Sequence, residues 1–283
     1  MAINNFIPTI WSAELLVSLK KSLVYGQEGV INRDYEGEIS AVGDTVKISG
    51  IGAVTIIDYV KNANLPDPEE LTDNTRTLTI TESKAFNFQV DDIDKAQQKP
   101  KVMQQAMAEA AYGLKNVADQ FIASLAAGVA PQNTIGTTAV PVVLANATEA
   151  YEYLVDLSTL LDEANVPEEG RFVVVPPFYE GYMLKDDRFV KSGVLPAETR
   201  LLNGMIGQAA GFNVLKSNNV PNTAGAAYKV IAGYNGAMSY AEQINDVEAY
   251  RPEKRFADAV KGLHLYGGKL VRPEGIAVLT VNR

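Results

Sequence analysis

The chain has 283 residues, enough for about two domains of ordinary size, and 47% of its residues are hydrophobic. Its formal net charge of −9 disfavours a protein whose main task is to coat DNA, because neutralising phosphates requires a basic surface. It contains no cysteine, which excludes disulfides, thiolate metal sites and thiol nucleophiles. The N-terminus lacks the pattern of a signal peptide, and no apolar stretch approaches the roughly 18–20 residues that cross a bilayer. We therefore expect synthesis in the cytoplasm and no membrane contact.

The first predicted element is an amphipathic helix over residues 12–25, with Ser12 as its N-cap. Leu15, Leu19 and Leu23 share one face, and the glycine that follows residue 25 ends the helix. Two interpretations remain open. The helix is either a surface helix that packs on its own subunit or an arm that reaches a neighbouring molecule.

Residues 45–90 are the most unusual part of the sequence. Two strand-like runs, 45–57 and 75–90, are joined by a polar stretch that contains two prolines, which predicts a long hairpin. Nothing near the runs in the sequence supplies a surface to pack on, and an isolated two-stranded ribbon is at best marginally stable in water. We expect a second copy of the chain to supply the missing surface.

A long helix is predicted over residues 100–127. Pro100 suits its first turn, where a missing N–H is tolerated, and Gly128 ends it. At 1.5 Å per residue the helix would be roughly 40 Å long. Gly113 in mid-helix costs about 1 kcal/mol relative to alanine, and a close packing contact would explain it. The predicted apolar stripe consists of Met103, Met107, Ala110, Leu114, Val117, Phe121 and Leu125.

The middle third of the chain alternates helix and strand, which is typical of a compact α/β or α+β domain. A helix over residues 147–164 begins with a capping box of Asn146 and Glu149. The run 171–177 is continuously apolar, which indicates a strand covered on both faces. The buried face of the helix is predicted to contain Tyr151, Leu154, Leu157 and Leu161. The other predicted elements are a helical turn at 178–184, a helix at 201–210 and strands at 212–217 and 228–232.

The C-terminal part reverts to strands, which are predicted at 247–250, 257–266 and 276–281. These strands need partners. The long helix and the base of the hairpin are the predicted partners, which makes the second domain discontinuous in sequence.

Catalytic motifs are scarce. The single histidine, His264, lies between two leucines in a strand pattern, and one imidazole without paired ligands does not make a metal site. Asp91, Asp92 and Asp94 precede a helix, where acidic residues are favoured by the helix dipole, and this explains the cluster better than a bound cation does. We expect no enzymatic activity, no metal and no cofactor.

Charge is divided unevenly along the chain. The stretch 59–74 between the hairpin runs has four acidic residues against one lysine, and the stretch 251–272 has six basic residues against two acidic ones. This predicts that the hairpin tip of one copy lies on the C-terminal part of another in a head-to-tail contact, because complementary charge sets register and partner choice. The predicted hairpin-tip surface comprises Tyr59, Lys61, Leu65, Asp67, Glu69, Glu70, Leu71 and Asp73. The predicted basic surface comprises Arg251, Lys254, Arg255, Lys261, Lys269 and Arg272.

The order of these elements resembles the HK97-fold major capsid proteins of tailed bacteriophages, over essentially the whole chain. Three stretches also look like that family: NGMIGQAAGFNVLKS at 203–217, FADAVKG at 256–262 and YGGKLVRPEG at 266–275. The resemblance implies an α+β, HK97-like capsid fold. Its implied parts are an N-terminal arm (1–44), an extended E-loop hairpin (45–90), a peripheral P-domain (91–139 and 236–283) with a spine helix (100–128), and a compact axial A-domain (140–235).

The resemblance further implies a function. A protein of this family would self-assemble through pentamers and hexamers into an icosahedral shell that encloses double-stranded phage DNA without gripping it. Its place would be the virion capsid, after synthesis and assembly in the cytoplasm of the host bacterium. A separate scaffolding protein and a portal are the implied partners. Two alternatives remain: an encapsulin-type compartment with protein cargo, and a small-molecule enzyme whose active domain is the α/β middle.

Overall fold

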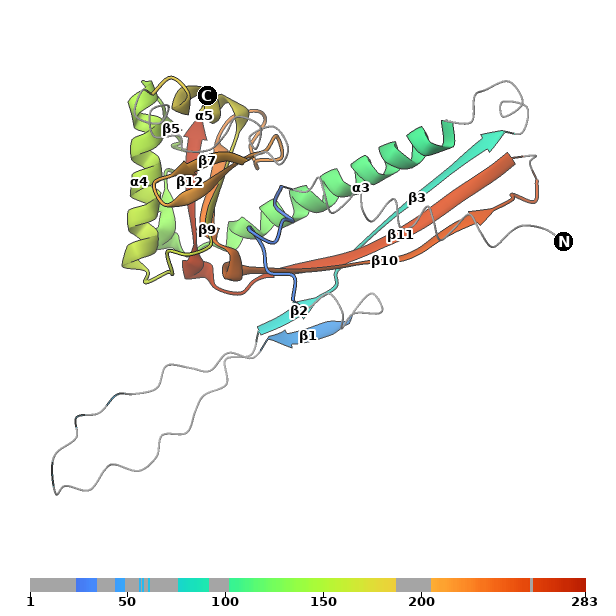
Figure 1. Ribbon diagram of the computed structural model, residues 1–283, viewed down its shortest axis with the longest axis horizontal. Helices are drawn as coiled ribbons and strands as arrows, with labels where there is room; N and C mark the ends of the chain where they lie inside the picture. Colours follow the sequence, from blue (N-terminus) through green and yellow to red (C-terminus); the bar gives the residue numbers. More distant parts are fainter. Residues whose placement is uncertain are drawn as a thin grey trace.

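The computed structural model divides the protein into two main parts, shown in Figure 1. One part is a seven-stranded sheet with two helices, and the other is a three-stranded sheet of long strands with one long helix beside it. A two-stranded ribbon, the hairpin base, lies next to the second part. The structure describes residues 24–34, 44–48, 56, 58, 61, 76–91, 102–186, 205–254 and 257–283.

The helices and strands follow one another in this order: β1 (Thr45–Ile48), β2 (Arg76–Thr79), β3 (Glu82–Asp91), α3 (Val102–Leu125), β4 (Thr134–Ile135), β5 (Val142–Val143), α4 (Ala147–Glu163), β6 (Arg171–Val175), α5 (Pro177–Met183), β7 (Met205–Ala209), β8 (Phe212–Lys216), β9 (Tyr228–Tyr234), β10 (Met238–Tyr250), β11 (Ala257–Leu270) and β12 (Ile276–Asn282). Short 3-10 turns connect several of them: η2 (Ala126–Gly128), η3 (Pro131–Asn133), η4 (Asn235–Ala237) and η5 (Pro273–Gly275).

The seven-stranded sheet has the order β4-β12-β9-β6-β8-β7, and β5 also pairs with β12. Its central strand β6 is buried along all five residues, as the continuous apolar run predicts. Val173 and Val175 pack with the α4 and α5 side chains, whereas Phe172 and Val174 belong to a second core cluster on the opposite face. Alternation along the strand thus fills two cores, one on each side of the sheet.

Helix α4 begins where the capping motif predicts. The side-chain oxygen of Asn146 accepts a hydrogen bond from the Glu149 N–H at 3.0 Å, and the Glu149 carboxylate accepts one from the Ala145 N–H at 2.7 Å. The predicted leucines of the buried face are fully buried. Ala150 completes this face, and Tyr151 is only half-buried, because the buried stripe lies slightly to one side of the predicted one.

Helix α3 ends close to the predicted position, but its buried stripe is displaced. The positions that face the sheet include Ala111 and Ala118, whereas Val117 is 39% exposed. These small side chains allow the helix to approach the sheet closely, whereas the larger Val117 lies on the outer side of the helix. Gly113 has no neighbour within 4 Å of a Cβ placed on it, so the close contact predicted there is absent within the described part of the subunit.

The predicted hairpin is confirmed at its base and wrong at one end. β1 and β2 pair antiparallel, with Val46 opposite Leu78. The continuation of the second run, however, forms β3, which pairs along its whole length with β11 rather than with the first run. The chain changes direction between β2 and β3, where Ile80 packs against Ala241 and Leu265 of the three-stranded sheet.

Two predicted helices need correction. Residues 205–209 form strand β7 instead of the predicted helix at 201–210, whose first four residues lie outside the described part. Ala210 and Gly211 have φ angles of 50° and 81°, which is the geometry of a two-residue hairpin turn into β8. Residues 24–30 form turns and bends, so residues 24 and 25 are not part of the helix predicted at 12–25. The other residues of that prediction lie outside the described part of the chain.

The C-terminal strands divide between the two sheets. β10 and β11 are long antiparallel neighbours, and β11 pairs with β3 and packs on α3, as predicted. β12 is the exception, because it lies between β9 and the short strands β4 and β5 in the seven-stranded sheet. The prediction that the last strand is a partner of the hairpin base is therefore wrong, whereas the predicted packing near the long helix holds in part, because Ile276 and Val278 share a core cluster with Ile122 and Ala123 of α3. The domain boundaries themselves stay a prediction.

Candidate assembly surfaces

The hairpin base is anchored to one face of the three-stranded sheet. Its apolar side chains form a small core with Ala241 of β10 and Leu265 of β11. A Cβ at Gly267 would collide with the carbonyl oxygen of Thr79, so only glycine lets the ribbon approach this closely. The side chains that the hairpin base and its connection to β3 contribute are Val46, Leu78 and Ile80, with Ile48 partly buried beside them.

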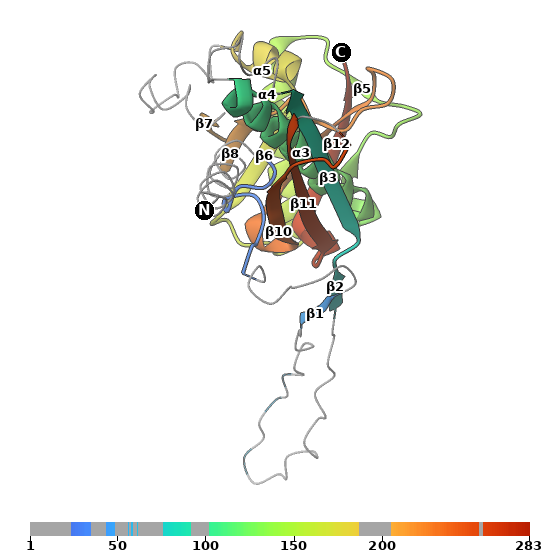
Figure 2. The same ribbon diagram turned by 90° about the vertical axis from the view of Figure 1, so that its right-hand side faces the viewer.

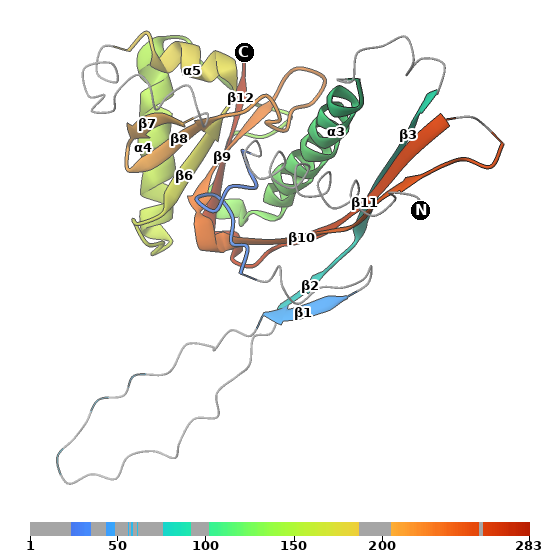
Figure 3. The same ribbon diagram turned by 45° about the vertical axis from the view of Figure 1, so that its right-hand side comes forward.

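Helix α3 covers the opposite face of the same sheet. A Cβ at Gly268 would meet Leu125 of α3, whereas its neighbour Gly267 faces the hairpin base. Farther along β11, Val260 packs with Met107 of α3. Figures 1, 2 and 3 show the same arrangement, with α3 and the ribbon β1–β2 on either side of the long strands. The subunit therefore presents two different surfaces on opposite sides of one sheet.

The predicted hairpin-tip surface is mostly outside the described residues. Of its eight members only Lys61 is described, in an exposed turn. Two further described residues on the same connection, Ile56 and Asp58, are also exposed. Ile56 is 91% exposed, which is unusual for a large β-branched hydrophobic side chain.

The predicted basic residues do not gather into one compact patch. Lys261 and Lys269 are eight positions apart on β11, about 26 Å at the rise of a β-strand. Lys261 forms an ion pair with Glu248 at 2.8 Å, and this hydrogen bond raises the pKa of the lysine. The remaining described members, Arg251, Lys254, Lys269 and Arg272, are exposed, and Arg255 lies outside the described residues.

The outer face of α3 is a surface that sequence reasoning missed. Tyr112 is 61% exposed beside the open backbone of Gly113, and Val117 follows one turn later. Over its 24 residues the helix has only three charged side chains, and one of them, Asp119, is buried. A solvent-facing helix is usually lined with charged residues. The scarcity of charge in the α3 sequence could have indicated this face.

A buried polar network lies between the long strands and the segment at residues 24–34. The Glu242 carboxylate of β10 forms an ion pair with Arg33 and accepts a hydrogen bond from the Tyr240 hydroxyl at 3.0 Å. His264 Nε2 lies 3.2 Å from the same carboxylate, and the ring is fully buried. Burial alone would raise the pKa of Glu242, but His264, Arg33 and Tyr240 together lower it to about 2.

A second buried carboxylate, Asp119, sits in the middle of α3. One oxygen accepts hydrogen bonds from the N–H groups of Tyr25 at 2.8 Å and Val24 at 3.1 Å. The other accepts one from the Asn219 side chain at 3.0 Å. Burial raises the pKa of Asp119, against the lowering effect of these hydrogen bonds. No local pattern marks this residue, because its partners lie 94 to 100 positions away.

Comparisons with known proteins decide the family. The sequence matches the phage capsid protein family over residues 73–279. The chain therefore belongs to the phage capsid proteins, of the HK97 type. A solved structure from Mycobacterium phage Che8 is 32% identical to this capsid protein, with 98% of each chain covered and a TM-score of 0.70. A comparison with curated proteins gave no match.

More distant structures share the fold of this capsid protein. The capsid of cyanophage P-SCSP1u is 14% identical, with 93% of this chain and 89% of that chain covered and a TM-score of 0.71. The SrpI encapsulin of Synechococcus elongatus is 13% identical, with 86% and 84% covered and a TM-score of 0.57. These relatives are structural shell proteins, which is consistent with a capsid protein that is not an enzyme. Among the described residues, no helix has the length and apolar character to span a bilayer.

Proposed function

We propose that this protein is the major capsid protein of a tailed phage and assembles through pentamers and hexamers into an icosahedral shell around double-stranded DNA. The observation that carries the proposal is the position of the hairpin base and the outer face of α3 on opposite faces of one sheet. Head-to-tail contacts require two different surfaces on opposite sides of a subunit, and they close into rings when the rotation permits. The same proposal assigns no catalytic activity to the chain.

In this proposal the hairpin that starts from the β1–β2 base, residues 45–79, is the E-loop, and beyond this base it would extend away from its own subunit. Its tip, residues 59–73, would rest on a neighbouring subunit. Ile56 supports this, because a side chain with 91% of its surface exposed gains free energy when a neighbour covers it. The acidic residues of the tip would meet basic side chains that are spread along the stretch 251–272 rather than gathered in a single patch.

The outer face of α3 is the complementary surface on the next subunit. Tyr112 and Val117 offer apolar area, and the open backbone at Gly113 leaves room for a neighbouring chain to approach closely. Glycine in mid-helix costs about 1 kcal/mol relative to alanine. Nothing in the described part of the subunit offsets this cost, whereas a contact between subunits would offset it.

The proposed partners follow from the same arrangement. The shell would enclose DNA without specific binding, since a chain with a net charge of −9 does not attract phosphates strongly. A separate scaffolding protein and a portal would take part in assembly, which would occur in the cytoplasm of the host bacterium before the protein becomes part of the virion. The second candidate, an encapsulin-type compartment, is favoured by the shared fold of SrpI.

The test is to purify the protein and image it by negative-stain electron microscopy, beside a variant that lacks residues 60–73. We expect closed shells or rings from the intact chain, and from the deletion a folded subunit that does not assemble. A chain that stays monomeric at high concentration in the presence of the scaffolding protein, or normal shells from the deletion variant, would contradict the proposal. Nucleic-acid and mass analysis of intact particles then separates a DNA-filled capsid from a compartment with protein cargo.

A further inference from the structure

The chain crosses between the two sheets at one narrow junction, which we call the waist. Three connections pass through it: η2 and η3 between α3 and β4, η4 between β9 and β10, and η5 between β11 and β12. They are tied together by hydrogen bonds. The side chain of Asn133 donates to the carbonyl oxygens of Glu274 at 2.8 Å and Ile276 at 3.1 Å, and the Ala237 carbonyl accepts from the N–H of Val271 at 2.9 Å.

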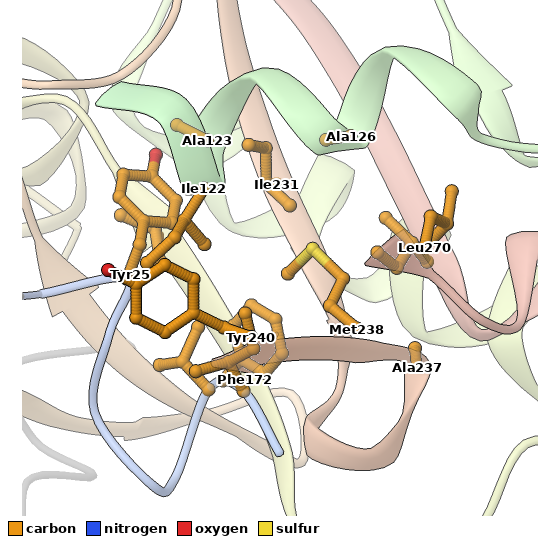
Figure 4. Close-up of a cluster of buried hydrophobic side chains, with 14 of the residues drawn as sticks. Tyr25, Ile122, Ala123, Ala126, Phe172, Ile231, Ala237, Met238, Tyr240 and Leu270 are labelled. Carbon is orange, nitrogen blue, oxygen red and sulfur yellow. The ribbon is translucent and has the colours of Figure 1, made fainter. Parts of the chain in front are cut away.

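An apolar core fills one side of the waist, and Figure 4 shows its members. Ile122 comes from α3, Ile231 from β9 and Met238 from β10, so both sheets contribute to it. Tyr25 also lies in this core, although it belongs to neither sheet. An extra segment, residues 24–34, thus forms part of the contact between the two sheets. We call this segment the strap.

The first end of the strap is held by Asp119. This carboxylate is 1% exposed and accepts hydrogen bonds from two backbone N–H groups of the strap, those of Val24 and Tyr25. Its second oxygen accepts a hydrogen bond from the side chain of Asn219, which follows β8 of the seven-stranded sheet. One carboxylate therefore joins three parts of the molecule: the long helix, the strap and the connection after β8.

The second end of the strap is held by the long strands. The Asn32 N–H donates to the Met238 carbonyl at 3.0 Å, and the Tyr240 N–H donates to the Asn32 carbonyl at 3.0 Å, so the strap adds a short bridge to the edge of β10. Arg33 then pairs with Glu242, which is 9% exposed. The strap therefore reaches from Asp119 and the connection after β8 to the three-stranded sheet.

Between its two ends the strap is packed on one side only. Val30 and Ile31 are fully buried in the waist core, whereas a pocket of about 610 Å³ lies between the strap and Tyr234–Gly236, the turn that leads from one sheet to the other. Packing therefore holds the apolar side of the strap, and space remains on the side of the turn. The polar anchors at the two ends add directional hydrogen bonds that apolar packing does not supply.

We propose that Asp119 and Glu242 are positioning residues that fix the angle between the two sheets and thereby set the curvature at which neighbouring subunits meet in the shell. This inference rests on the proposed function of the protein. Removing a carboxylate from water is costly unless its partners compensate, and a carboxylate held by fixed partners favours one geometry over others. A strap held by apolar contacts alone could slide, whereas hydrogen bonds with fixed partners hold one position.

The first experiment compares shells of Asp119→Asn and Glu242→Gln with those of the unaltered protein by electron microscopy. We expect the two variants to lose the uniform diameter and to give mixed, open or tubular assemblies. Glu180→Gln is the matched control. Glu180 pairs with Lys216 within the seven-stranded part, does not cross the waist and should keep the normal diameter. Folded variants that build shells of normal, uniform diameter would overturn the inference.

A swap of partners tests whether position or mere stability is involved. In Asp119→Asn the charged acceptor of Asn219 is replaced by an NH2 group, so only a neutral amide–amide hydrogen bond can form, and only after the Asn219 amide turns over. Adding Asn219→Asp restores a donor and an acceptor with their roles exchanged. We expect the double variant to recover the uniform diameter, and its melting temperature is measured beside the single variant. A uniform loss of stability, with no change in diameter in any variant, would contradict the role in positioning.

A subunit measurement keeps the inference testable if a variant fails to assemble. Because the chain has no native cysteine, spin labels can be placed at Glu163→Cys and Glu253→Cys, one exposed position in each part. We expect a single narrow distance in the labelled parent and a broader or shifted distribution when Glu242→Gln is added. An unchanged distribution would refute the inference. Failure of the unaltered chain to form shells in the presence of the scaffolding protein would instead refute the proposed function, so the two failures are distinguishable.

Discussion

The two parts of the molecule differ in how they complete their structures. The seven-stranded part buries its central strand on both faces and is covered by its own helices α4 and α5. The three-stranded part carries α3 on one side, yet it leaves Tyr112 and Val117 on that helix exposed. The first part is finished in its core, although Val140 and Val143 at its edge are 74% and 63% exposed. The second part has a sheet with a different layer on each face, one of which is the hairpin base. Subunit stability and assembly are therefore expected to respond to different substitutions.

The sharpest test of the finished part is Leu157→Ala. Leu157 is fully buried between α4 and the seven-stranded sheet, and truncating such a side chain costs about 2–5 kcal/mol. We expect this decrease in the free energy of unfolding, measured by urea denaturation of the subunit. Val155→Ala on the same helix is the control, since Val155 is 41% exposed and should change stability by less than about 0.5 kcal/mol. Equal effects would mean that α4 is not a core helix.

Acid should destabilise the folded subunit by protonating Glu242, which pairs with Arg33 of the strap. The pKa of Glu242 is about 2 in the folded protein and 4.5 as a reference, so its ionised form is stabilised by folding. That stability is present above pH 4.5 and is lost as the pH falls toward 2, about 3 kcal/mol in all. The groups facing it are Arg33, Tyr240 and His264. Glu242→Gln should remove this part of the acid sensitivity in thermal melts recorded across the pH range, and an unchanged slope would contradict it.

The two adjacent glycines of β11 allow the two faces of the three-stranded sheet to be probed separately. Gly267→Ala places a methyl group against Thr79, which should displace the hairpin base and cost on the order of 1–3 kcal/mol. Gly268→Ala places one against Leu125 of α3 instead. Hydrogen exchange should become faster in β1 and β2 for the first variant and at the end of α3 for the second. The same pattern in both would argue against separate faces.

The smallest expected effect on stability comes from Gly113→Ala. The added methyl group meets no atom within 4 Å, so the helix should gain up to about 1 kcal/mol. Assembly should nevertheless be impaired, because the methyl group fills space that a neighbour is proposed to use. Light scattering during assembly measures the second effect. A more stable subunit that assembles at the normal rate would show that this face makes no contact.

The sequence predicted those features whose causes are local. Asn146 and Glu149 are three residues apart and define the start of α4, and the apolar run at 171–175 contains all the information that a doubly covered strand needs. Glycines were harder to interpret, since Gly211 gave no sign whether it ends a helix or turns a hairpin. Its φ angle of 81° fits both, since a glycine that ends a helix is also left-handed, so only the pairing of β7 with β8 decides this.

Features with distant causes could not be predicted. Asp119 reads as an ordinary helix acid until residues 24, 25 and 219 are brought to it. The placement of β12 in the other sheet depends on β9, β4 and β5, none of which marks it in the sequence. The basic residues of the stretch 251–272 were predicted as one surface because they are close in sequence, although a long strand, β11, lies within the stretch. An extended strand separates such residues in space.

The position of β12 has a consequence for folding during synthesis. Its partners on both sides, residues 134–143 and 228–234, leave the ribosome before it does, and the whole of β10 and β11 is made in between. Until Ile276–Asn282 emerges, β9 keeps an unpaired edge in the middle of an unfinished sheet. Exposed edges of this kind attract other chains. A nascent subunit is thus open to mispairing for as long as it takes to translate the intervening hairpin, and chaperone protection would be most useful in that interval.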